Sequence, residues 1–425
     1  MDRSPKTDDR IPGGEDPLPP PSPEARGHAA SRPAVSGIRY SSLDACRAAA
    51  MMLGLFFHGA ISFLRIPVGW AIRDRSTSVA VDAFVWICHT FRMPVFFLLA
   101  GFFGRLLYVK LGPAAFIRHR AKRLLVPFVV TLVPLLPALY GLWAWGRAKQ
   151  PDRGPMFGID SSTHPFDSMT PSPAHLWFLY YLMMLLGVMV LVVAAARPFD
   201  RLLVGVDQVV RTIVRYRLAL FVLAIPTAAT LHPMLALSCD TPVDFVPQPR
   251  ILGYYFVFVA FGWLLHRQPE LIEELGRRLW IPLLVAVAVI SPVGAAVEQV
   301  VRSGRPSNPA LWTGRLYLSA LLGWALVLLF LGAFVKWGAQ PRPWVSYLSD
   351  ASYWCYLVHL PIVIALQIVA ADLPWPGLLK YAIVMTGTIA ACLGSYRAMV
   401  RTTFIGAALN GSRKTQSLSA AAAID

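Results

Sequence analysis

The chain has 425 residues, of which 56% are hydrophobic and only 15% are charged. Its apolar residues stand in uninterrupted runs of about eighteen or more, which are typical of membrane-spanning helices and exclude an ordinary soluble domain. The formal charge of +16 is large enough to suggest nucleic acid as a partner, but the positions of the basic residues argue against that.

Residues 1–37 are polar and rich in Pro, Gly and charged residues, without the apolar stretch of a cleavable signal peptide. We expect a disordered cytoplasmic tail there, with the first apolar segment acting as an uncleaved signal anchor. A membrane domain is expected over residues 38–400. Residues 401–425 are expected to form a short cytoplasmic tail.

Ten apolar segments follow the first tail, and we expect each of them to be a transmembrane helix of an all-α polytopic protein. The sixth and seventh are the weakest span predictions, because they are short or carry a proline. The ten segments are residues 43–63, 84–108, 124–145, 176–196, 218–237, 252–266, 280–297, 316–335, 353–371 and 378–396.

The Lys and Arg residues predict the orientation of these spans. If the N-terminus is inside, the inner loops and both tails hold most of the basic residues, with the densest cluster at 105–123. The positive-inside rule then favours cytoplasmic N- and C-termini. Most of the positive charge is therefore a topology signal, and we expect no nucleic-acid partner.

The first apolar segment contains Arg47 and His58, two groups that a lipid-facing helix avoids. Eleven residues separate them, close to three helical turns, so they project from one face about 16 Å apart along the axis. Asp44 lies one turn before Arg47 on the same stripe. Exposing any of them to lipid costs at least a few kcal/mol, so we expect them to face the protein interior as a functional site.

The second segment adds His89 and Arg92, which are three residues apart and share a helix face. Pro94 permits a kink and Gly101 a close helix approach. Buried charge is costly in a membrane, which favours a functional role for the pair. The alternative is that His89 and Arg92 only link helices through hydrogen bonds.

The start of the fourth segment carries His175 and Trp177, which we consider as substrate-binding residues. A cluster of aromatic residues at this position is equally typical of a membrane-interface anchor. The preceding external loop, residues 146–174, suits recognition of a hydroxyl-rich acceptor, although a solvated loop would have the same composition. Its acidic and imidazole side chains are Asp152, Asp160, His164 and Asp167.

The ninth segment supplies Tyr356 and His359, which lie on one face a turn apart and are also candidates for substrate binding. A lone intramembrane histidine is as often a hydrogen-bonded structural residue.

On the inner side, Arg118, Arg120 and Arg123 belong to the densest basic loop. That loop is either a topology signal with anionic lipid contact or the binding site of a polyphosphate donor such as coenzyme A, because Arg matches phosphate oxygens well.

Four motifs in this order resemble the acyltransferase family 3 membrane proteins, in particular those of the glucans biosynthesis protein C branch. The resemblance covers residues 40 to about 396. The motifs are LDACR with ten residues before His58, HTFRMPVFFLLAGFF from His89, HLWFLYYL from His175 and ASYWCYLVHLP from Ala351.

The resemblance implies a ten-helix bacterial inner-membrane enzyme that moves an acyl group, succinyl or acetyl, from cytoplasmic acyl-CoA to a hydroxyl of a periplasmic or cell-surface glycan. The Arg-x10-His motif of the family falls on Arg47 and His58, and its second-span polar pair falls on His89 and Arg92. Ala100 and Leu360 depart from the family pattern, where Ser and a second His are common. Both departures concern the substrate more than the reaction class.

The chemistry expected from these residues agrees with acyl transfer. A hydroxyl needs a base, for which His58 is the candidate, and the developing oxyanion needs a donor such as Arg92 or Arg47. Acyl-CoA would be held by Arg47 and the basic loop, as a co-substrate rather than a permanently bound cofactor. No serine nucleophile is identifiable, so direct transfer is expected. The alternative class is a transporter or flippase in which the same residues bind an anionic substrate or relay protons.

Overall fold

The computed structural model describes residues 36–65, 68–151, 171–234, 237–338, 343–403, 405–406 and 409. All regular elements within these ranges are helical, which confirms the all-α prediction. The helices are α1 (Ser36–Ala60), α2 (Val79–Leu111), α3 (Pro113–Arg120), α4 (Val126–Lys149), α5 (Trp177–Ala196), α6 (Asp200–Arg215), α7 (Ala219–Leu231), α8 (Pro249–Leu265), α9 (Leu271–Gly276), α10 (Trp280–Ser303), α11 (Pro309–Trp337), α12 (Pro343–Ala370) and α13 (Gly377–Ser395).

Eight apolar helical stretches of the described chain are long enough to cross a membrane. One of them joins α3 and α4 through a π-helical stretch, Ala121–Leu125, into a single run of 37 residues. Another extends α13 through a second π-helical stretch, Tyr396–Val400. The protein is therefore a polytopic helical membrane protein.

Two of the ten expected spans, the fifth and the sixth, are shorter than the eight long helical stretches, as was expected of the sixth. Helix α7 has 13 residues and α8 has 17, about 20 and 26 Å of helix. The seventh segment, one of the two weakest predictions, is instead a full-length helix of 24 residues, α10. The fifth falls short because α7 ends at Leu231, just before His232 and Pro233, and a proline does not continue a helix.

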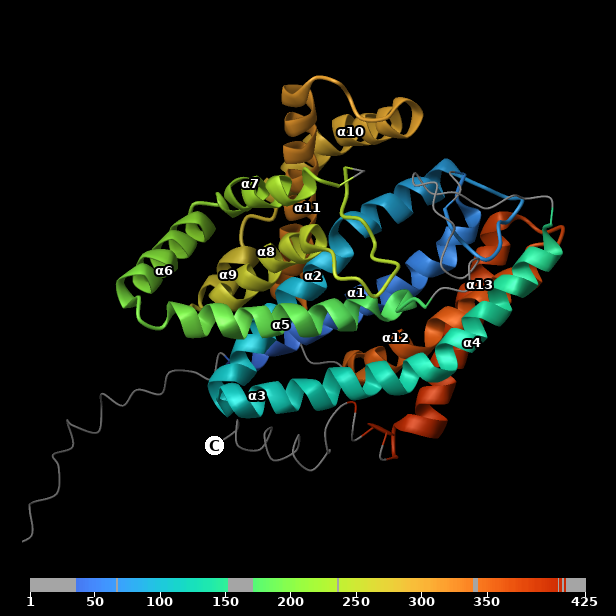
Figure 1. The fold of residues 1–425 in the computed structure, drawn as a ribbon, viewed down its shortest axis with the longest axis horizontal. Helices are drawn as coiled ribbons and strands as arrows, with labels where there is room; N and C mark the ends of the chain where they lie inside the picture. The colour runs from blue at the N-terminus through green and yellow to red at the C-terminus, as the bar shows by residue number, and fades with distance from the viewer. Residues whose placement is uncertain are drawn as a thin grey trace, which may run out of the picture. The chain divides into compact units, whose positions relative to one another are not determined.

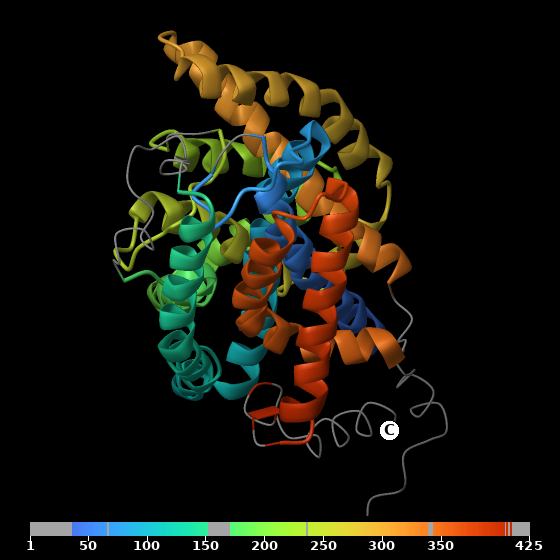
Figure 2. The same ribbon diagram turned by 90° about the vertical axis from the view of Figure 1, so that its right-hand side faces the viewer.

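The most buried spans form the core. Within their apolar stretches, α1 buries 67% of its residues and α11 61%, whereas α4, α10 and α13 each bury 28%. Helices α10 and α11 pair as a hairpin on one side of the bundle, and α12 pairs with α13 and also packs on α4 on the other side (Figures 1 and 2). The central helices α1 and α2 lie between these groups and carry the candidate site.

Two glycines bring α2 and α8 into backbone contact. A Cβ on Gly101 would lie 2.0 Å from the carbonyl oxygen of Val259, and one on Gly262 would lie 1.9 Å from that of Leu98. Only glycine fits at either position, because the obstacle is backbone that cannot rotate away. This confirms the close helix approach predicted at Gly101, and it fixes α2 firmly against α8.

The connections between spans contain helices that the sequence did not predict. Helix α6 is held by Asp207, whose carboxylate accepts two hydrogen bonds of 2.6 Å from the guanidinium of Arg267. Short helix α9 packs on α6 and on α11.

Some predictions concern residues outside the described ranges. These are the tail from residue 1 to 35, the loop residues Asp152, Asp160, His164 and Asp167, and the chain after residue 409. Helix α1 begins at Ser36, two residues before the expected start of the membrane domain.

Candidate active site

A small cavity of about 70 Å³ lies among α1, α2, α5 and α12. We call it the histidine chamber. Its polar lining residues are His58, His89, Arg92, His175, Thr241, Tyr356 and His359. The structure thus brings together side chains that the sequence placed in four separate segments, and this convergence was not evident from their spacing.

Three imidazole rings form a row in the chamber. The ring centre of His359 lies 5.1 Å from that of His58 and 5.0 Å from that of His175. His359 bonds through Nδ1 to the carbonyl oxygens of Cys355 and Tyr356, at 3.1 and 2.8 Å, and His175 bonds through Nε2 to that of Tyr356 at 2.9 Å. Because a carbonyl only accepts, these nitrogens carry the hydrogen, and the opposite nitrogen of each neutral ring has a free lone pair.

Several polar atoms of the chamber are buried without a hydrogen-bond partner among the described residues. They are Nδ1 of His58 and of His175, Nε2 of His359 and Nε of Arg92. A buried polar atom left unsatisfied is costly and needs an explanation. A ligand that enters the chamber with hydroxyl and carbonyl groups would satisfy these atoms.

Arg92 reaches the chamber because a glycine faces it. A Cβ on Gly54 of α1 would lie only 2.4 Å from Nη1 of Arg92. The guanidinium also lies over the ring of Phe57, 4.7 Å from its centre, where the ring face attracts a cation. The two contacts hold the positive charge of α2 against α1, close to His58.

Two other predicted residues, His89 and Trp177, also line the chamber but make contacts beyond it. His89 bonds through Nε2 to the carbonyl oxygen of Cys239 at 3.0 Å, so it also links α2 to the connection between α7 and α8. Trp177 is 7% exposed and its ring lies against those of Phe97 and Tyr255, so it sits inside the bundle rather than at a lipid interface.

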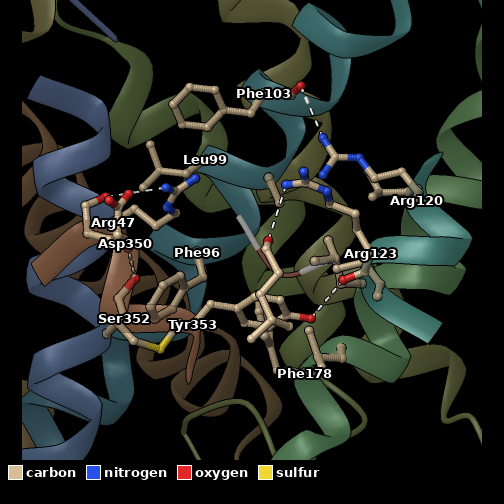
Figure 3. Close-up of a pocket in the computed structure, with 18 residues that line it drawn as sticks. Arg47, Phe96, Leu99, Phe103, Arg120, Arg123, Phe178, Asp350, Ser352 and Tyr353 are labelled. Carbon is tan, nitrogen blue, oxygen red and sulfur yellow. Dashed lines mark hydrogen bonds between the residues drawn. The ribbon is translucent and has the colours of Figure 1, made fainter. Parts of the chain in front are cut away.

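A second, larger pocket of about 370 Å³ opens on the side of the basic loops (Figure 3). We call it the inner pocket. Arg47 and Asp350 lie on one side of it and Arg120 and Arg123 on the other (Figure 3). Its walls are apolar and aromatic, and include Phe96, Leu99, Phe103, Phe178, Leu182 and Leu186. A cationic rim above apolar walls suits a ligand with an anionic head and a less polar arm.

The arginines of the inner pocket have different partners. Arg47 pairs with Asp44 at 3.1 Å, as the stripe predicted, and Arg123 donates to the carbonyl oxygen of Leu409 at 3.3 Å. No salt bridge to Arg120 or Arg123 occurs in the described part of the chain. Arg118 is exposed and does not line the pocket.

The π-helical stretch Ala121–Leu125 shapes this rim. A π-turn leaves backbone groups displaced from the regular helical ladder, and such turns are frequent at functional sites. Here the carbonyl oxygen of Arg123 accepts a hydrogen bond of 2.9 Å from the hydroxyl of Tyr353 on α12. This bond ties the rim to the helix that carries His359.

The two pockets share the side chains of Met51 and Phe178, which line both of them. On α1, Met51 lies between Arg47, which lines the inner pocket, and His58, which lines the chamber. The face of α1 predicted from the spacing therefore runs from one pocket to the other.

Sequence analysis missed Trp70 and Gln367, which surround His58. The indole of Trp70 stacks on the His58 ring, with 5.9 Å between centres and 13° between planes. The Gln367 side chain is 2% exposed and bonds to the backbone at the end of α1. The available signal was that Gln367 is the one polar side chain of α12 after His359.

These features define a polytopic α-helical membrane protein with a polar intramembrane chamber and an adjoining cationic pocket. Residues 40–397 match the family model described as an acyltransferase domain, Acyl_transf_3. The chain therefore belongs to the acyltransferase family 3 membrane proteins, as the four motifs indicated.

Curated relatives match a shorter part of the chain. Glucans biosynthesis protein C of Escherichia coli strain SMS-3-5 is 34% identical over 94 residues, which is 22% of this chain and 24% of that protein. The same protein of strain K12 is 33% identical over 94 residues, with the same coverage. The match thus spans about a quarter of the length of these relatives. No solved structure matches the chain.

Proposed function

We propose that this protein transfers an acyl group, succinyl or acetyl, from cytoplasmic acyl-CoA to a hydroxyl of a periplasmic or cell-surface glycan. The observation that carries the proposal is the shared wall of the two pockets. A donor bound at the arginines of the inner pocket would place its arm beside Met51 and Phe178, which also line the histidine chamber. The relatives named for glucan biosynthesis support a glycan as the acceptor.

The donor would enter from the inner side. Its phosphates would lie at Arg120 and Arg123, whose guanidinium groups match phosphate oxygens and have no carboxylate partner in the described chain. The pantetheine arm would run along the apolar wall formed by Phe96 and Leu99. Arg47, at the start of the shared face of α1, would hold the arm or a free carboxylate of a succinyl group.

Transfer would take place in the chamber. The acceptor hydroxyl would attack the thioester carbonyl carbon while His58 takes its proton as general base. The negative charge that develops on the carbonyl oxygen would be stabilised by Arg92, whose guanidinium lies beside α1. The carbon–sulfur bond then breaks, and the proton returns from His58 to the CoA sulfur, which leaves as a thiol.

The remaining imidazoles would bind the acceptor. His359 and His175 each present a nitrogen lone pair, and a sugar supplies hydroxyl groups that can donate to it. Trp177 and Tyr356, which line the same chamber, would add aromatic surface for the sugar ring. The acceptor would approach from the outer side, where Thr241 follows the short helix α7.

Purified protein in detergent tests this proposal against the transporter alternative. Acetyl-CoA and succinyl-CoA are supplied in turn with an oligoglucan acceptor, and free CoA thiol and acylated glycan are measured. We expect acceptor-dependent release of thiol with one of the donors, and release at least about a hundredfold slower for a His58→Ala variant. An intact thioester under all conditions would favour a carrier. Mass spectrometry of envelope glycans from cells with and without the gene then identifies the acyl group.

A further inference from the structure

Helix α1 ends at Ala60, two residues after His58, and the side chain of Gln367 bonds to that end. The last carbonyl groups of an α-helix have no partner within the helix. Here Nε2 of Gln367 donates to the carbonyl oxygens of His58 and Gly59, at 3.0 and 2.9 Å. Gln367 comes from α12, so the bond joins the backbone of His58 to the helix that carries His359.

The oxygen of the same Gln367 amide bonds to Trp70. The indole nitrogen of Trp70 donates to Oε1 of Gln367 at 2.8 Å. This pattern fixes the orientation of the amide, because a rotated amide would place its oxygen against two carbonyl oxygens. Gln367 therefore acts as donor and acceptor at once, which neither a carboxylate nor an apolar side chain of the same size can do.

Trp70 in turn covers one face of the His58 imidazole. The two ring planes are 13° apart and their centres are 5.9 Å apart. Two close contacts fix the residues that follow Trp70 in the connection between α1 and α2. Lys380 of α13 forms a buried salt bridge of 2.8 Å with Asp74, and a Cβ on Gly146 of α4 would lie 2.1 Å from the carbonyl oxygen of Ala71.

We propose that Gln367 is a positioning residue for His58, and that Trp70 is the wall against which the imidazole is held. This inference rests on the proposed function of His58 as the base. With one ring face against the indole and the backbone tied to α12, the imidazole presents its edge to the chamber in one orientation. A displacement of about 1 Å of a catalytic group costs on the order of a hundredfold in rate. The hydrogen bonds of Gln367 would prevent such a displacement of His58.

Two substitutions separate the bond from the packing. Gln367→Met keeps the volume and removes all three hydrogen bonds, whereas Trp70→Phe keeps an aromatic face and removes the indole donor. Trp354→Phe is the matched control. Trp354 lies on the same helix, is half-buried like Trp70, and donates its indole hydrogen to Ser395 at 3.0 Å, but it lines neither pocket.

The first measurement is turnover. We expect Gln367→Met to lower kcat about ten- to a hundredfold with the KM for acyl-CoA unchanged, and Trp354→Phe to change neither. In a His58→Ala background, Gln367→Met should cause no further loss, because the two changes act through the same group. An additive loss, or an equal rise in donor KM, would assign Gln367 a general structural role and overturn the inference.

The second measurement does not need catalysis. Diethyl pyrocarbonate modifies exposed imidazoles, and peptide mass spectrometry measures its rate at His58. We expect modification at least several-fold faster in Gln367→Met and Trp70→Phe than in wild type or Trp354→Phe, at equal thermal stability. Unchanged reactivity would refute the positioning role. If the two variants are modified faster but the wild type transfers no acyl group, the positioning inference is kept and the proposed function is refuted instead.

Discussion

Replacing Gly54 by alanine tests the position of Arg92 without touching its charge. The new Cβ would lie 2.4 Å from Nη1 of Arg92, whereas ordinary contact begins near 3.4 Å. The guanidinium must therefore move by about 1 Å. Because the obstacle is the end of a flexible side chain and not backbone, the helices keep their places and the protein still folds.

The cost should appear in catalysis. An oxyanion donor moved by about 1 Å loses much of its effect, and the complete loss of such a donor costs about a hundred- to a thousandfold in turnover. We expect Gly54→Ala to lower kcat about ten- to a hundredfold. The KM for acyl-CoA should change little, because Gly54 lines the chamber and not the inner pocket. The assay is release of CoA thiol in detergent, with thermal stability measured in parallel.

Gly141→Ala on α4 is the matched control, because a Cβ there meets no atom within 4 Å. Alanine is the better helix former by about 1 kcal/mol, so the control should be as stable as wild type or slightly more so, with normal turnover. Normal turnover in Gly54→Ala as well would remove Arg92 from the proposed oxyanion role.

Three further predictions follow from the site and the topology. His58→Ala should lose roughly two or more orders of magnitude in transfer while it still inserts and folds, as measured by thiol release and thermal unfolding. Replacing Arg120 and Arg123 with Gln should raise the donor KM more than it lowers kcat, and the donor affinity of the wild type should weaken as salt rises. Reporter fusions after Gly158 and after Gly205 should report opposite sides of the membrane.

Each of these has a result that counts against it. Near-normal turnover in His58→Ala would exclude it as the base. Arg118→Gln is the control for the donor site, since Arg118 belongs to the same loop but is exposed outside the pocket. If the double variant behaves like Arg118→Gln, the loop is only a topology signal. Fusions that report the same side would refute the arrangement of ten spans.

The candidate site could be predicted as far as helical periodicity reaches. The spacing of Arg47 and His58 placed both on one face of α1, and the structure confirms that this face joins the two pockets. Intramembrane polarity likewise singled out Arg92 and His359. These predictions depend only on the regular geometry of a helix and on the cost of placing charge in lipid.

The remainder depends on contacts between distant segments. Trp70 lies in an irregular connection and meets Gln367 297 residues later in the chain. No local pattern relates the two residues. The end of α7 also differs from the prediction. The hydropathy pattern continues to residue 237, but the helix ends at Leu231, just before Pro233. The sequence also does not give the solvent exposure of each side chain in the basic loop, so it could not distinguish exposed Arg118 from Arg120, which lines the inner pocket.

The short helix α7, which precedes the packed helix α8, has a consequence for the surrounding lipid. Hydrocarbon about 30 Å thick does not match a helix of about 20 Å that is exposed on one face, so the bilayer thins beside α7 or water enters from one side. The connection between α7 and α8 carries Cys239, which bonds to His89, and Thr241 of the chamber. A thinner bilayer beside α7 would bring the aqueous boundary closer to the residues that line the chamber, and lipid chain length would then change how wet that side of the chamber is.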